Sequence, residues 1–282
     1  MLIVDSQVHL WAPNTPERPW PKVEDPPPHR TVALGIDEML GEMDSAGVHR
    51  VIIVPPSWEG GRNDLALAAA KAYPDRFAVM ARLDPAAPSS RGSMIDLRRQ
   101  PGMLGLRFAF RASAALRQLT EGHADWIWGE AEKAGIPVSI LVRHDLVHLI
   151  DEIAQRYPNL RIALDHLGLT GTKKDEEAFR NFDKLLPIAK RPNVAAKVSA
   201  LPCFSNDAYP YRSLHGYIRK AYDAFGPKRL FWGTDFSRSP ISYRQNVTMF
   251  TEEIPWLTNE DKDLIMGRGV CEWLGWNVPE AR

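Results

Sequence analysis

The sequence predicts a single closed barrel of eight parallel strands alternating with helices, a (β/α)8 TIM barrel that spans residues 1–282 as one domain. Three observations predict it. Eight short apolar runs recur along the chain, helical stretches ending in Gly or Pro separate most of them, and several runs end in a His, Asp or basic residue. In such a barrel the carboxyl ends of all strands surround one mouth, where the chemistry lies.

The eight runs are rich in the apolar residues of buried parallel strands. They are Leu2–Ser6, Arg50–Pro55, Phe77–Leu83, Met103–Phe108, Pro137–Val142, Arg161–His166, Asn193–Ser199 and Arg229–Asp235.

Helical stretches lie between these runs. In Ile36–Ala46 the apolar residues recur with amphipathic spacing. The other predicted helices end directly before a Gly or a Pro, an ordinary helix stop; they are Leu65–Tyr73, Asp125–Ala134, Leu146–Tyr157 and Ala221–Phe225. An open doubly wound sheet is the alternative, but no Gly-x-Gly-x-x-Gly follows any predicted strand.

Composition narrows the classes of function. The 282 residues are 44% hydrophobic and carry 35 basic and 35 acidic side chains, so there is no broad electrostatic case for nucleic acid or an anionic membrane. No run approaches the roughly 20 apolar residues of a membrane span. Two cysteines make no disulfide framework. We expect a cytoplasmic protein without a signal peptide that acts on a small molecule; a homo-oligomer stays open.

Three polar residues at strand ends are the strongest catalytic candidates. Gln7 and His9 are two residues apart, so both point to the same side of an extended strand. His166 and Asp235 end two other strands. Taken singly, each histidine has a structural reading as a hydrogen-bonded core residue, and Asp235 has one as a helix cap. Together at one mouth, His9, His166 and Asp235 form a candidate site.

Basic residues also stand at strand ends. Arg107, Arg143 and Lys197 follow or lie within apolar runs, where a charge is costly unless it is paired or functional. Lys197 either pairs with a carboxylate inside the barrel or, with Arg107, holds an anionic or carbonyl group of the substrate. His144 either reaches the mouth, caps the next helix or lies in solvent.

Two loops leave the mouth without a regular pattern. A Pro- and Trp-rich segment at about 11–30 is long enough to be a lid or binding loop, and a second loop spans 201–211. Alternatively the prolines stiffen exposed loops and the aromatic side chains shield the top of the barrel. The candidates for an aromatic substrate wall are Trp11, Trp58, Phe204 and Tyr209.

Five short motifs occur in an order typical of one family. They are Asp5–Trp11, Gly105–Phe108, Asp165–Gly168, Lys197–Ser199 and Gly233–Asp235. In these motifs the chain resembles the amidohydrolase superfamily, specifically its amidohydrolase-2 group, and looks most like the branch that includes 2-pyrone-4,6-dicarboxylate lactonase and sugar-acid lactonases. The motifs are spread over nearly the whole chain, so the resemblance covers the domain.

The resemblance implies a (β/α)8 barrel with functional positions at His9, His166 and Asp235 and substrate binding by Arg107. Gln7 stands where the family has the first histidine of a His-x-His pair, and glutamine is a poor zinc ligand. That departure excludes a binuclear centre. It implies either a site that needs no cofactor or one divalent ion, such as zinc, held weakly by His9, His166 and Asp235.

The leading hypothesis is hydrolysis of a lactone or similar cyclic ester of a carboxylated or aromatic-derived small molecule. Asp235 is then the general base, and His9 and His166, helped by Gln7, polarise the carbonyl. One alternative is metal-dependent decarboxylation or C–C cleavage of an aromatic acid, which demands a bound ion. Another is an inactive barrel that only binds a ligand.

Overall fold

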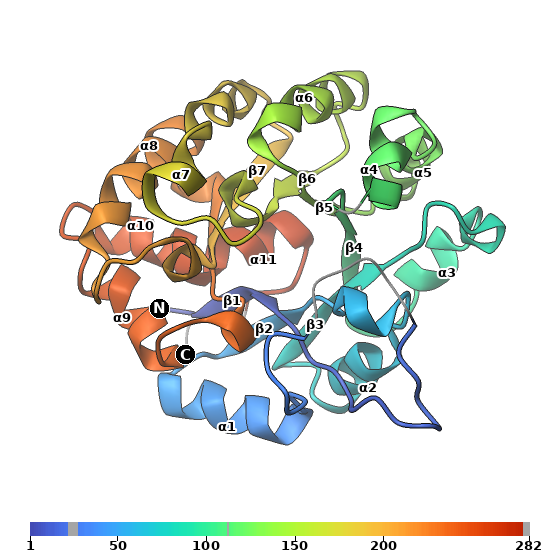
Figure 1. Ribbon diagram of the computed structural model, residues 1–282, viewed down its shortest axis with the longest axis horizontal. Helices are drawn as coiled ribbons and strands as arrows, with labels where there is room; N and C mark the ends of the chain where they lie inside the picture. The colour runs from blue at the N-terminus through green and yellow to red at the C-terminus, as the bar shows by residue number, and fades with distance from the viewer. Residues whose placement is uncertain (22–27, 112, 279–282) are drawn as a thin grey trace.

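Eight parallel strands form one sheet whose spatial order is their order in the sequence (Figure 1). The computed structural model describes residues 1–21, 28–111 and 113–278. The strands are β1 (Val4–Val8), β2 (Arg50–Ile53), β3 (Phe77–Arg82), β4 (Met103–Ala109), β5 (Val138–Leu141), β6 (Ile162–Leu164), β7 (Val194–Ser199) and β8 (Leu230–Gly233). The predicted fold class and all eight predicted strands are confirmed, with ends that shift by a few residues.

The barrel closes where its last strand meets its first. Just past β8, the backbone N–H of Asp235 donates to the Gln7 carbonyl in β1 at 2.8 Å. This hydrogen bond brings residues from the two ends of the sequence to the same point of the mouth.

Helices surround the ring of strands (Figure 1). They are α1 (Ile36–Ala46), α2 (Asp64–Ala72), α3 (Met94–Arg98), α4 (Ser113–Thr120), α5 (Asp125–Ala134), α6 (Val147–Arg156), α7 (Asp175–Phe179), α8 (His215–Phe225), α9 (Tyr243–Thr251), α10 (Asn259–Asp263) and α11 (Gly269–Leu274). The bounds predicted for α1 and α5 are confirmed. Helix α8 begins earlier than predicted because Ile218 continues the buried face that Ala221 and Phe225 form. No helix among the described residues is long and apolar enough to cross a membrane.

Two apolar layers hold the barrel together. The outer layer packs strand residues such as Val51 and Ile53 against the helices, here Met39 and Met43 of α1. The inner layer takes residues from most strands, and α11 packs against it. Its members are Val4, Ile52, Val54, Ala78, Met80, Leu104, Ala163, Ala195, Phe231, Val270, Cys271 and Leu274. The inner layer fills the barrel below the strand ends, so the polar residues gather above it.

A bulge in β1 breaks the expected alternation of side chains. Asp5 pairs with Val51 but Val8 pairs with Ile53, so β1 holds one extra residue between them. The Asp5 carboxylate accepts from the Tyr243 hydroxyl of α9 at 3.0 Å. Gln7 instead contacts Lys197 of β7 across the barrel. The bulge therefore aims Gln7 into the barrel although Asp5, two residues earlier, turns to a helix.

The predicted lid loop is described in part. Residues 22–27 lie outside the described residues. In the part before them, Arg18 donates to Glu59 at 3.0 Å and to Asp64 at 2.7 Å, which fastens this segment to the start of α2. Its function as a lid stays a prediction.

A glycine near the end of β8 tests the tight packing at the barrel seam. In Gly233→Ala the new Cβ would lie 2.6 Å from Ser6 Oγ and 3.1 Å from Asp5 Oδ1. We expect a loss of about 1–3 kcal/mol in the free energy of unfolding, measured by urea denaturation. Gly216→Ala in α8 is the control, because its Cβ meets nothing within 4 Å and alanine favours a helix. Equal stability of the two variants would contradict the packing argument.

Candidate active site

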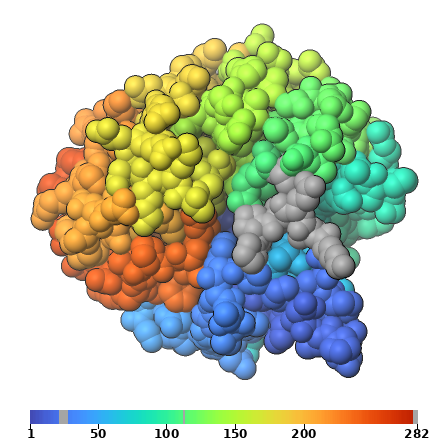
Figure 2. Space-filling model, viewed as in Figure 1, coloured from blue at the N-terminus to red at the C-terminus, as the bar shows by residue number. Residues whose placement is uncertain are grey.

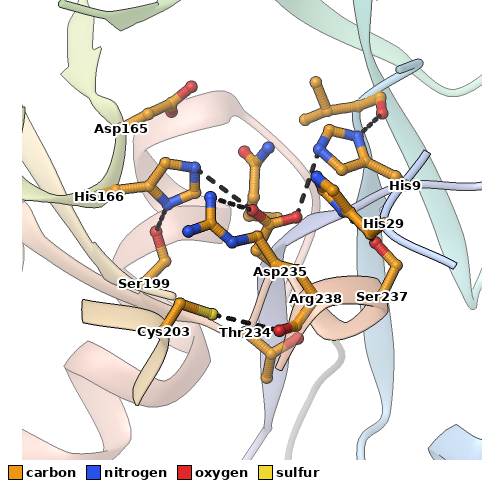
Figure 3. A network of polar contacts seen from close by, with 12 residues as sticks. His9, His29, Asp165, His166, Ser199, Cys203, Thr234, Asp235, Ser237 and Arg238 are labelled. Atoms are coloured by element: carbon orange, nitrogen blue, oxygen red, sulfur yellow. Dashed lines mark hydrogen bonds and ion pairs between the residues drawn. The ribbon is translucent and has the colours of Figure 1, made fainter. Parts of the chain in front are cut away.

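The three predicted residues converge at the carboxyl ends of three strands. His9 Nε2 lies 3.3 Å from Asp235 Oδ1, and His166 Nε2 lies 3.8 Å from Asp235 Oδ2. Figure 3 shows the Asp235 carboxylate between the two imidazoles. All three are nearly buried, with exposed fractions of 7%, 3% and 2% for His9, His166 and Asp235. Their proximity is thus observed, and their catalytic roles stay a prediction.

Unusual backbone conformations place two of these residues. His166 has φ 53° and Asp235 has φ 52°, the left-handed region that non-glycine residues seldom adopt. Each stands just after its strand, so the left-handed turn takes the chain out of the sheet at the mouth. Such local strain is often retained at functional sites.

The hydrogen bond of His9 to the backbone fixes its tautomer. Nδ1 lies 2.6 Å from the Val54 carbonyl oxygen, which only accepts, so Nδ1 carries the proton. Burial lowers the pKa of His9 to about 3, and the ring is neutral at pH 7. Its Nε2 therefore presents a lone pair to a carboxylate oxygen. Two acceptors that face each other call for a shared donor between them.

The second imidazole is also neutral. His166 Nδ1 shares a hydrogen bond with Ser199 Oγ at 2.8 Å, and burial lowers the pKa of His166 to about 4. For Asp235, burial acts to raise the pKa, but the charges of the neighbouring histidines, once these are protonated in acid, and of the Arg238 guanidinium outweigh it and hold the pKa below its ordinary value. At neutral pH the site is a carboxylate between two uncharged imidazoles.

A buried chain of charges lies beside this site. Lys197 Nζ contacts Asp165 Oδ1 at 2.9 Å and donates to Gln7 Oε1 at 3.0 Å. Arg107 Nε donates to Asp165 Oδ2 at 3.0 Å. Burial acts to raise the pKa of Asp165, but the two cations outweigh it and the pKa is lowered. The Asp165 carboxylate therefore pairs with two cations inside the barrel, and Lys197 has the carboxylate partner that was one of its two predicted roles.

A cavity opens at the ends of the second, third and fourth strands. Its volume is about 440 Å³, within the range of small-molecule sites. Arg107, Phe108 and Phe110 line it. Because Arg107 also binds Asp165, this side chain links the cavity to the buried charges.

The aromatic candidates form two groups. Trp58 packs edge-on against His9 with ring centroids 5.8 Å apart, and Trp11 packs against Trp58 at 5.3 Å. Phe204 is fully buried, and the central carbon of the Arg238 guanidinium lies 5.0 Å from the centroid of the Phe204 ring. The Tyr209 hydroxyl hydrogen-bonds Thr248 of α9. Each of the four packs against protein, and the substrate wall they were expected to form stays a prediction.

Arg143 and His144 lie away from the carboxylate and support its surroundings. Arg143 forms a salt bridge with Asp145 at 2.9 Å, with both side chains about half exposed. His144 Nε2 donates to the Leu167 carbonyl at 2.7 Å, within the turn that carries His166. This contact holds the His166 turn in place, and substrate binding by either residue stays a prediction.

One residue of the site escaped the sequence analysis. His29 lies next to His9, with ring centroids 5.6 Å apart, and packs edge-on against Trp58 at 5.0 Å. Its Nδ1 shares a hydrogen bond with Ser237 Oγ at 2.8 Å (Figure 3). A single histidine after a Pro-rich stretch has no strand or motif to mark it. Figure 2 shows the N-terminal segment in blue meeting the orange segment after β8 on this face.

A metal ion would need several donor side chains grouped around one point. Within residues 1–21, 28–111 and 113–278, no three His, Cys, Asp or Glu side chains are grouped so that they could hold one. Asp235 lies between the imidazoles, and each Nε2 faces a different carboxylate oxygen. The residues as placed do not fit an ion. The set His9, His166 and Asp235 stays a prediction as metal ligands.

The neutral imidazoles predict a loss of stability in acid. Between pH 6.5 and pH 4 the unfolded chain binds protons at His9 and His166 that the folded chain does not, so stability falls as the pH falls. Each histidine contributes about 1.4 kcal/mol per pH unit. Asp5, whose pKa burial raises to about 6, opposes this trend. In His166→Asn we expect the loss between pH 6.5 and pH 4.5 to shrink by about 2 kcal/mol in urea unfolding. An unchanged pH dependence would contradict the neutral state.

Comparisons with known proteins agree with the fold. A family model described as Amidohydrolase (Amidohydro_2) matches residues 4–268. The L-fucono-1,5-lactonase of Burkholderia ambifaria is 26% identical over 254 residues, which cover 85% of this chain and 81% of that protein.

Two solved structures share the fold over 98% of this chain. One is an amidohydrolase from Burkholderia multivorans with bound zinc, with a TM-score of 0.80, 19% identity and 99% of its own chain covered. The other is a probable 2-pyrone-4,6-dicarboxylic acid hydrolase from Acinetobacter baumannii with citric acid bound, with a TM-score of 0.75, 20% identity and 100% covered. Because the family model spans nearly the whole sequence, the chain belongs to the Amidohydro_2 family and is a hydrolase of that family.

Proposed function

We propose that this hydrolase opens a lactone or a similar cyclic ester of a small carboxylated molecule. The observation that carries the proposal is the Asp235 carboxylate, held ionised between two neutral imidazoles. A buried carboxylate with no hydrogen-bond donor on Oδ1 among the described residues is suited to act as a general base.

The nucleophile is a water molecule held by two acceptors. Asp235 Oδ1 and His9 Nε2 are 3.3 Å apart, and a water that lies to one side of this pair can donate one hydrogen to each. As the water oxygen attacks the ester carbonyl, Asp235 takes its proton. When the ring C–O bond breaks, Asp235 returns that proton to the leaving oxygen. The products are one hydroxyl and one carboxyl group, and the base is regenerated.

The cavity supports a substrate that carries both an anionic group and a ring. Arg107 offers a guanidinium to a carboxylate, and Phe108 and Phe110 offer apolar walls. The Acinetobacter relative binds citric acid, a tricarboxylate, and the Burkholderia ambifaria relative acts on a sugar-acid lactone. These likenesses support a cyclic ester of a carboxylic acid as the substrate class.

Metal-dependent cleavage is the second candidate. One relative holds zinc, and two imidazoles with a carboxylate are chemically suitable donors. A single divalent ion would be held by His9, His166 and Asp235, whose imidazoles now face different oxygens of the carboxylate. Decarboxylation or C–C cleavage of an aromatic acid would depend on that ion.

Replacing the general base tests the mechanism. We expect Asp235→Asn to lower kcat on the best substrate of a lactone panel by at least about 10³-fold, because the amide cannot take the proton of water. A pH indicator reports the released acid. Asp223→Asn, an exposed residue of α8, should keep wild-type turnover. Retained activity in Asp235→Asn with an unchanged melting temperature would refute the assignment.

Removal of metal separates the two candidates. For ester hydrolysis by side chains alone, we expect dialysis against a chelator to leave kcat/KM on the lactone within about twofold, since no step passes through an ion. Metal analysis of protein purified without chelator accompanies the assay. Stoichiometric metal together with loss of activity on dialysis and recovery with zinc would favour the metal-dependent alternative.

A further inference from the structure

The side-chain amide of Gln7 has a buried hydrogen-bond donor without a partner among the described residues. Gln7 is fully buried, and its Nε2 has no hydrogen-bond partner among the described residues. Leaving such a donor unpaired costs about 1–3 kcal/mol. Because this unpaired N–H destabilises the free protein, we expect it to find its hydrogen-bond acceptor in a bound ligand.

The orientation of this amide is fixed by its neighbour. Lys197 Nζ, which lies 3.0 Å from the Gln7 side chain, can only donate. The atom facing Lys197 must therefore be the carbonyl oxygen Oε1, and Nε2 must point to the other side of the amide. Asp165 holds Lys197 at 2.9 Å, so the orientation rests on a chain of buried contacts.

Gln7 also lies beside the proposed base. The backbone carbonyl oxygen of Gln7 accepts from the backbone N–H of Asp235 at 2.8 Å, and the bulge in β1 turns the Gln7 side chain into the barrel. The amide thus lies in the wall that also carries His9 and Asp235.

The reaction needs a donor that His9 does not provide. In its neutral tautomer the His9 proton is on Nδ1 and is given to Val54, so Nε2 accepts and cannot stabilise an oxyanion. The expectation that His9 polarises the carbonyl therefore does not hold for this tautomer. The side-chain N–H of Gln7, a residue joined to Asp235 through the backbone, has no competing acceptor among the described residues and fits that need.

We propose that the Gln7 Nε2–H binds the substrate's carbonyl oxygen and stabilises the oxyanion formed when water attacks. The inference rests on the proposed ester hydrolysis and names the group that takes the place of a metal in that reaction. Gln7 is then a catalytic residue, and Lys197 is a positioning residue that acts through it. The donor is oriented before substrate arrives, which is the condition for strong electrostatic stabilisation.

Two substitutions of Gln7 test the proposal. Gln7→Glu keeps an oxygen for Lys197 and removes the donor, and Gln7→Met removes the donor without adding a charge. We expect both to lower kcat by about 10²–10³-fold, the usual effect of losing one oxyanion donor, with KM within about threefold. The control is Ser6→Ala, the preceding residue, which is equally buried and also has an unpartnered oxygen. It should keep kcat within about threefold of wild type.

Stability separates a catalytic amide from a structural one. Because Nε2 is idle in the free protein, Gln7→Glu should melt within a few degrees of wild type. Full kcat in both variants would overturn the proposal, and so would a large fall in melting temperature that accounts for the lost activity.

If the wild-type protein opens no lactone, the proposed function is wrong, but the binding role of Gln7 can still be tested by a measurement that needs no turnover. The side-chain amide protons of Gln7 can be assigned by NMR through their loss in Gln7→Glu. With citrate as the probe, we expect these resonances to move on titration. If they stay unmoved at saturating citrate, the assignment of Gln7 as a ligand-binding donor is wrong.

Discussion

The backbone hydrogen bond from Asp235 to Gln7 is the contact on which the site depends. It joins the end of β8 to β1, and it places residues more than two hundred positions apart within one pocket. The bulge in β1 then turns Gln7 inward, and His9 follows at the strand end. A change in the register between β8 and β1 would displace Asp235, His9 and Gln7 together.

Two buried carboxylates show how the same residue type serves opposite purposes. Asp165 is paired with Lys197 and Arg107, so it is satisfied within the fold. Asp235 faces two neutral imidazoles, and the Arg238 guanidinium lies 3.8 Å from its Oδ2, while its Oδ1 has no hydrogen-bond donor among the described residues. The first carboxylate is paired within the fold, and the second keeps one oxygen open, as the proposed general base requires. The contrast is between a carboxylate in a structural ion pair, Asp165, and one with an oxygen available to a ligand, Asp235.

Much of the fold could be predicted because each buried strand is a short apolar run and each helix ends at a Gly or Pro. His9, His166 and Asp235 could be predicted because they stand at strand ends. The ion pairs of Asp165 could not be predicted, because the alternation of side chains along a strand does not reveal two cations on other strands of the barrel. His29 could not, because its loop has no periodicity. The bulge that separates Asp5 from Gln7 leaves no mark in the sequence either.

The most direct test is the protonation state of the two site imidazoles, observed by nitrogen-15 NMR of the histidine rings. The account predicts that His9 and His166 are both uncharged at pH 5.5, with the His9 proton on Nδ1. An imidazolium at either position at pH 7, or a His9 proton on Nε2, would contradict the picture of a carboxylate between two neutral rings.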